Sequence, residues 1–164
     1  MMHKKSILVL ILLFYIGCNE NGQAPPPPFP QVTLSASESS IEVDNVGALY
    51  VNVANINHLY AISFEIMYDH SILEIDMESV AVSYDQFTSN NFGPVVYSDD
   101  GALSFVFGGN NIDGEIFSVP IQGLKAGTTN VALNKVNLKQ EDGTDVPNYN
   151  SLVLENIEIT VIAP

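Results

Sequence analysis

Hydrophobic and polar residues alternate most regularly along Leu59–Ile75, and this stretch organises the prediction for the whole chain. One side of the alternation carries Tyr60, Ile62, Phe64, Ile66 and Tyr68. The other side carries Ala61, Ser63, Glu65 and Met67. Because successive side chains of a strand point to opposite faces, the pattern predicts a strand with one core face and one free face. It ends at Asp69, whose carboxylate can accept hydrogen bonds from nearby backbone N–H groups and so form a tight corner.

Shorter alternating runs, separated by turn sequences, fill the rest of the chain from residue 31 onward. About nine short strands, and no window with the 3.6-residue period of a helix, predict an all-β sandwich. The alternation changes phase near Asn134-Lys135, which predicts a β-bulge there, and again near Glu155-Asn156. Pro120 lies within an apolar run and predicts an edge strand or a bulge.

The first 30 residues are predicted to lie outside this domain. Two lysines lead into the apolar run Ile7–Ile16, which is too short to span a membrane comfortably as a mature helix. Residues 1–18 end in Cys18 and resemble a bacterial lipoprotein signal peptide, in which the cysteine becomes the lipidated N-terminus. An ordinary signal peptide or an uncleaved anchor is the alternative. Residues 19–30 contain four consecutive prolines and predict an extended tether for the domain at 31–164.

Acidic residues dominate the charge of the chain. It carries 19 Asp and Glu against 5 Lys and no arginine, for a net charge of −14. Cleavage before Cys18 removes two lysines and lowers the net charge to −16. Such a surface repels phosphate backbones, which argues against nucleic-acid binding. Solubility is the plain explanation of the acidity, and a basic or calcium-loaded partner is the functional one.

Three segments carry motifs that are shared with a known family. They are Val51–Ile75, with its YD corner and LEI run, Gly101–Gly123, with a glycine-rich turn and an aromatic run, and Ala126–Leu133, which is followed by ITV near the C-terminus. In this order they resemble cohesin domains, the jelly-roll modules that bind dockerins in cellulosome-type assemblies. The resemblance implies an all-β, nine-stranded jelly-roll β-sandwich. A neighbouring superfamily of carbohydrate-binding modules shares the same packing motifs.

The resemblance also implies a docking face. In cohesins the dockerin lies on one sheet face, which it reaches partly from the outward side of the long strand. The implied partner-binding residues are Ala61, Ser63, Glu65 and Met67. By register from the YD corner, the positions that carry Asn and Asp in well-studied members are Ala61 and Ser63 in this chain. The polar anchors of the family are therefore missing, and the face is predicted to be flatter and more apolar.

Two other groups of residues are candidate sites. An aromatic platform for stacking sugars is offered by Tyr84, Phe87, Phe92 and Tyr97, although a loop folded over the sandwich edge is the plainer explanation. Clustered carboxylates that suit calcium occur at Glu141, Asp142 and Asp145, without the alternation of an EF-hand loop. Apart from that weak calcium candidate no cofactor is expected, and calcium is assigned more naturally to the partner.

Three functions follow as hypotheses. The first is a non-catalytic, cohesin-like module that is exported, is held by its lipid at the outer membrane or cell surface, and binds a protein partner such as a dockerin-bearing enzyme of polysaccharide breakdown. The second is a carbohydrate-binding lipoprotein that uses the aromatic residues. The third is a hydrolase, which would need two carboxylates converging at about 5–9 Å if it acted on glycosides. We expect no enzyme, because the sequence contains no nucleophile-elbow or phosphate-loop pattern. We also expect no second module, because the chain ends right after its last alternating run.

Overall fold

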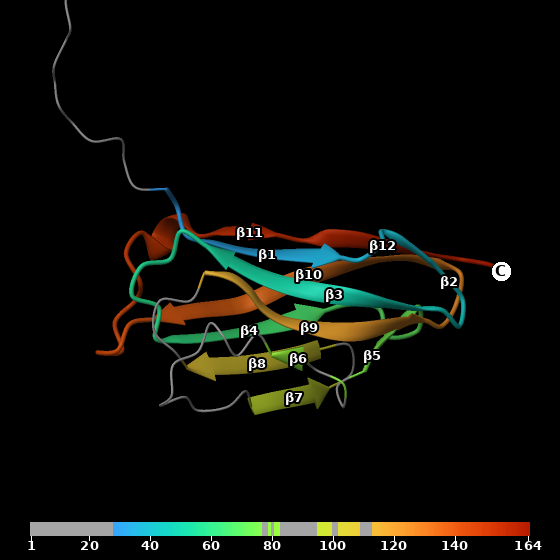
Figure 1. Ribbon diagram of the computed structural model, residues 1–164, viewed down its shortest axis with the longest axis horizontal. Coiled ribbons are helices and arrows are strands. Elements are labelled where there is room, and N and C mark those ends of the chain that lie inside the picture. The colour runs from blue at the N-terminus through green and yellow to red at the C-terminus, as the bar shows by residue number, and fades with distance from the viewer. Residues whose placement is uncertain (1–27, 77–78, 80, 83–94, 100–101, 109–112) are drawn as a thin grey trace, which may run out of the picture.

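Two β-sheets face each other in the computed structural model, which describes residues 28–164 except 77–78, 80, 83–94, 100–101 and 109–112 (Figure 1). The first sheet has the order β11-β1-β3-β9-β5, and β6 also pairs with β9. The second sheet has the order β2-β12-β10-β4-β8-β7. The prediction of an all-β sandwich is confirmed.

The strands of the first sheet are short at its edges and long in its middle. Their bounds are β11 (Val153–Glu155), β1 (Gln31–Ala36), β3 (Val46–Ala54), β9 (Gly114–Gly123), β5 (Leu73–Ile75) and β6 (Ala81–Val82). Those of the second sheet are β2 (Ser40–Glu42), β12 (Ile157–Ile162), β10 (Gly127–Lys139), β4 (Ala61–Met67), β8 (Ala102–Gly108) and β7 (Val95–Asp99). One turn of 3-10 helix, η3 (Tyr149–Ser151), precedes β11.

The N-terminal and C-terminal strands run side by side and cross between the sheets together. Strand β1 pairs with β11 in parallel in the first sheet, and β2 pairs with β12 in parallel in the second. The chain passes from β11 in the first sheet to β12 in the second at Asn156. The side-chain oxygen of Asn156 accepts a hydrogen bond of 2.8 Å from the backbone N–H of Leu133. The phase change near Glu155-Asn156 thus marks a strand that changes sheets. Such interruptions explain why the described residues contain twelve strand segments where the sequence predicted about nine.

Strand β9 corrects the prediction made from Pro120. Because β9 pairs with β3 on one side and with β5 and β6 on the other, it is an interior strand rather than an edge. The bulge of β9 lies four residues before Pro120, where Ile116 has no partner in the register with β3. Proline has no N–H to donate to a ladder, and Pro120 lies opposite the gap between β5 and β6. The carbonyl of Pro120 accepts a hydrogen bond of 2.9 Å from the N–H of Asp76, the first residue after β5.

The core fills the space between the sheets with side chains from alternate strand positions. On β4 the buried residues are Ile62, Phe64 and Ile66, as the alternation predicted. The ring of Phe64 stacks on that of Phe117 from the opposite sheet, with centroids 5.9 Å apart and an interplanar angle of 11°. Neither ring is more than 1% exposed. This pair joins the middle of one sheet to the middle of the other.

The two ends of the described chain lie at opposite ends of the sandwich (Figure 1). Residues 28–30 enter at the end where β1 begins, and Pro164 leaves at the end where β2 and β5 lie. Strand β4 lies between β10 and β8, inside the second sheet, and runs lengthwise between these two ends. Its outward side is therefore a flank of the molecule.

Replacing Phe64 with alanine should destabilise the domain strongly, because it removes a fully buried ring and leaves a cavity between the sheets. We expect the free energy of unfolding to fall by about 3–5 kcal/mol, measured by urea denaturation. The control is Leu154→Ala on β11, where the side chain is 40% exposed. A loss for Phe64→Ala no larger than that of the control would contradict the packing described.

Candidate functional site

The outward side of β4 carries the four residues that the sequence proposed for partner binding. Ala61, Ser63 and Glu65 are half-buried, and Met67 is 39% exposed. Their strand neighbours point into the core, so these four side chains are free of the packing between the sheets. The structure brings them together along one strand, over roughly 20 Å from the first to the last at 3.3 Å per residue.

Strand β10 extends this side of the sheet. Its register places Asn137 opposite Ser63, Asn134 opposite Glu65, and Ala132 opposite Met67. The amide of Asn137 donates a hydrogen bond of 3.3 Å to the hydroxyl of Ser63. We call the surface made by the four β4 residues together with Ala132, Asn134, Lys135 and Asn137 the β4–β10 face. On its other side β4 pairs with β8, of which only the backbone is described.

A β-bulge interrupts β10 in the middle of the β4–β10 face, where the sequence predicted one. The register with β4 shifts between Asn134 and Asn137, and Lys135 takes a positive φ of 47°. Side chains replace the ladder partners that the bulge removes. The amide of Asn137 donates to the carbonyl of Lys135 at 2.9 Å, and the hydroxyl of Tyr149 donates to the carbonyl of Val136 at 2.5 Å. The bulge is therefore a fixed feature of the fold rather than a loose segment.

The bulge places Lys135 against Glu65, a contact that the sequence did not predict. The ammonium lies 2.7 Å from one carboxylate oxygen of Glu65, and the amide of Asn134 lies 3.5 Å from the other. The lysine side chain is 69% exposed and the glutamate side chain only 20%. Exposed ion pairs contribute only about 0–1 kcal/mol to stability. The arrangement therefore matters less for stability than for what the face presents to solvent.

The corner that follows β4 is built as the sequence predicted. The carboxylate of Asp69 accepts hydrogen bonds from the hydroxyl of Ser71 at 2.7 Å and from its backbone N–H at 2.9 Å. These donors lower the pKa of Asp69 below its ordinary value. The N–H of Asp69 donates to the hydroxyl of Thr129, which is 3% exposed, at 2.9 Å. This last bond ties the corner to β10 and fixes the end of the β4–β10 face.

Two of the three calcium candidates have a local partner. Asp142 accepts hydrogen bonds from the hydroxyl and the N–H of Thr144, which lower the pKa of its carboxyl. Asp145 forms an ion pair of 2.6 Å with Lys139, and Glu141 is exposed. Among the described residues, no group of three or more His, Cys, Asp or Glu side chains is placed to hold a metal ion.

Several predicted sites lie outside the described residues. These are Cys18 and three of the four aromatic candidates, Tyr84, Phe87 and Phe92. The fourth, Tyr97, lies in β7, but its side chain is not described. Within the part of the chain that the structure covers, no helix has the length and apolar character needed to cross a membrane.

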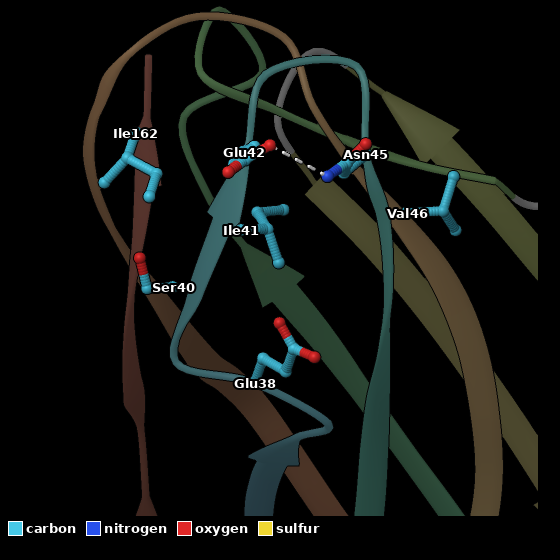
Figure 2. A pocket seen from close by; sticks show the side chains of 7 residues that line it. All are labelled: Glu38, Ser40, Ile41, Glu42, Asn45, Val46 and Ile162. Carbon is cyan, nitrogen blue, oxygen red and sulfur yellow. Dashed lines mark hydrogen bonds between the residues drawn. The ribbon is translucent and has the colours of Figure 1, made fainter. Parts of the chain in front are cut away.

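A hollow of about 520 Å³ lies between β2 and the start of β3, and sequence analysis gave no sign of it (Figure 2). It forms because β2 belongs to one sheet and β3 to the other, so the two arms of this connection diverge. Figure 2 shows Ile41 between Glu38 and Glu42. The hollow supplies two carboxylates, as the hydrolase hypothesis requires, but that of Glu42 already accepts a hydrogen bond of 3.3 Å from Asn45.

Comparison with known proteins defines the class of fold. No protein-family model matches the chain, and no curated protein sequence matches it. Solved cohesin domains, in contrast, have the same architecture, so the fold of this chain is cohesin-like.

Three of these structures show the extent of the likeness. A type II cohesin from the cellulosome of Acetivibrio cellulolyticus has a TM-score of 0.66 at 17% identity, over 80% of this chain and 95% of that one. A non-cellulosomal cohesin from the archaeon Archaeoglobus fulgidus has a TM-score of 0.65 at 15% identity, over 82% and 92%. The third cohesin of ScaC from A. cellulolyticus, solved in complex with the ScaB dockerin, has a TM-score of 0.65 at 20% identity, over 82% and 100%. At these identities the likeness concerns the fold.

Asp69 should make stability depend on pH in the acid range. Its folded pKa lies below the ordinary value of 3.8, so the charged form stabilises the fold fully above that value and this contribution is lost as the pH falls through the folded pKa. The melting temperature of Asp69→Asn should therefore lie below that of the wild type at neutral pH, and the two should converge in acid. Thermal denaturation followed by circular dichroism checks this. Ser71→Ala lacks the hydroxyl that donates to Asp69, so its melting temperature should vary less with pH in the acid range than that of the wild type. If each variant differed from the wild type by the same amount at every pH, Asp69 would not be the source of the pH dependence.

Proposed function

We propose that this chain is a non-catalytic binding module that docks a protein partner on the β4–β10 face. The observation that carries the proposal is the outward side of β4, where a continuous row of side chains is free of core packing. The cohesin-like fold supports it, because one cohesin of this architecture was solved in complex with a dockerin. The candidate partner is a dockerin-bearing enzyme of polysaccharide breakdown.

The chemistry of the β4–β10 face also supports a docking role. It combines apolar contacts at Ala61 and Met67 with hydrogen-bonding groups at Ser63 and Asn137, as protein interfaces do. Its hydrogen bonds join side chains of two neighbouring strands, so little side-chain freedom remains to be lost when a partner binds. The proposal needs no cofactor on this chain and assigns any calcium to the partner.

We further propose that the module is exported and is held at the outer membrane or cell surface by a lipid on Cys18. The apolar run before Cys18 and the proline-rich residues 19–30 support this arrangement. The tether would join the sandwich at the end where β1 begins (Figure 1). The β4–β10 face would then run along the flank of the molecule, from the attachment end toward the opposite end.

Arginine at Ser63 or Met67 should abolish capture of the partner, because it places a bulky charge in the middle or at the apolar end of the face. The test is a pull-down of the organism's secreted proteins on the immobilised full-length chain, followed by mass spectrometry. Both substitutions are at solvent-facing positions, so the melting temperature should change little.

The matched control for this test is Glu155→Arg, at an exposed position on β11 in the other sheet. Capture that survives both β4 substitutions means that the partner uses another surface. Retention on insoluble glycans with no protein captured would favour the carbohydrate-binding hypothesis. Turnover that is lost on replacing one acidic residue would favour the hydrolase hypothesis.

Replacing Cys18 with serine should release the protein from membranes, because serine offers no thiol for lipid attachment. Fractionation of cells that produce each form checks this, with the wild type expected in the membrane pellet and the variant in the soluble fraction. A variant that stays in the membrane pellet would contradict lipid anchoring at this residue.

A further inference from the structure

We infer that Lys135 makes the β4–β10 face selective for a partner that sets an Asp or Glu carboxylate against it. This inference rests on the proposed docking function and goes beyond it, because it states which charge the partner must carry. It reverses the expectation from overall composition, since a chain with a net charge of −14 would be expected to attract basic partners.

The first observation is that Glu65 is not available to a cation from a partner. One of its carboxylate oxygens is 2.7 Å from the ammonium of Lys135 and the other is 3.5 Å from the amide of Asn134. Its side chain is 20% exposed, against 69% for that of Lys135. The lysine and the asparagine therefore cover the glutamate. A molecule that approaches this part of the face meets the ammonium first.

The second observation is that the ammonium of Lys135 keeps donors to offer. A lysine ammonium has three N–H donors, and the contact with Glu65 uses one of them. A partner carboxylate can add to the ammonium without breaking that contact. A partner lysine or arginine at the same place would face a like charge.

The third observation is that the backbone of Lys135 is held in place. It lies on the β10 bulge, in a left-handed conformation with a φ of 47°. Its carbonyl accepts a hydrogen bond from Asn137, and the next carbonyl accepts one from Tyr149. The bulge fixes where the side chain leaves the strand, and the contact with Glu65 at 2.7 Å directs the ammonium, so the donor is offered at a defined place on the face.

The lysines of the domain are distributed unevenly. Residues 31–164 contain three lysines, and two of them, Lys135 and Lys139, lie on β10. Lys139 lies opposite Ala61 and pairs with Asp145 at 2.6 Å. The strand that forms half of the face thus carries most of the positive charge of an otherwise acidic domain. The partner that fits combines apolar side chains over Met67 with a carboxylate over Lys135.

The experiment uses as its probe the purified protein that the wild-type chain captures and the Ser63→Arg chain does not. Its affinity for full-length variants is measured by isothermal titration calorimetry. Lys135→Glu should weaken binding by about 30-fold or more, because it sets two carboxylates against each other. Lys135→Arg keeps the charge and should retain most of the affinity. Lys125→Glu makes the same change of charge at the one lysine of residues 31–164 outside β10 and should have little effect.

A charge exchange then separates recognition from a merely structural effect. Acidic residues of the probe are replaced one at a time by lysine, and one such variant should restore binding to the Lys135→Glu chain. Equal loss of affinity in Lys135→Glu and Lys125→Glu, or no loss in either, overturns the inference and leaves the docking function standing. If the wild-type chain captures no protein that Ser63→Arg fails to capture, the proposed function itself fails, and this inference fails with it.

Discussion

The strict alternation of side chains along β4 is the constraint on which the rest of the structure depends. Every second residue is committed to the core, where the ring of Phe64 stacks on that of Phe117 at 5.9 Å. That contact fixes which side of the second sheet faces inward. A one-residue slip in register would turn the whole set over. The alternate residues Ala61, Ser63, Glu65 and Met67 are thereby excluded from the core. They form a surface whose composition can serve binding at little cost to stability.

The bulge in β10 converts this surface from a plain sheet into one with a defined chemical character. A regular strand would have continued the ladder of backbone hydrogen bonds with β4 past Asn134 without a shift in register. The extra residue instead turns Lys135 over Glu65 at 2.7 Å, and side chains of Asn137 and Tyr149 satisfy the carbonyls that lost their partners. The irregularity is thus supported by one side chain of β10 itself and by one from η3. Bulges of this kind commonly re-aim a side chain near a functional site.

Local features of the fold could be predicted from the sequence because each depends on residues close together in the chain. The buried positions Ile62, Phe64 and Ile66, the corner at Asp69 and the bulge near Lys135 all leave a trace in the alternation or in a turn sequence. The stretch that resembles cohesins pointed to the same architecture. The outward residues of β4 could likewise be predicted, because every second residue of a strand lies on the same face.

Features that join distant segments could not be predicted in this way. Lys135 and Glu65 are 70 positions apart, and nothing in either local sequence indicates that they meet. The passage of the last strand from one sheet to the other at Asn156 left only a change of phase, which a bulge would also produce. Pro120 predicts an edge strand or a bulge because proline lacks a donor, yet it lies in an interior strand, at a point where the neighbouring strand is interrupted. The hollow beside Glu42 results from two strands diverging into different sheets, which is a property of the topology.

The most direct test of docking on the β4–β10 face is to observe the methyl groups of that face while the partner binds. With carbon-13 methyl labels on alanine and methionine, the account predicts that the captured protein shifts the NMR signals of Met67, Ala61 and Ala132, and leaves those of Ala36 and Ala54 on the other sheet unchanged. Shifts confined to Ala36 and Ala54, with Met67 unperturbed in a saturated complex, would contradict it.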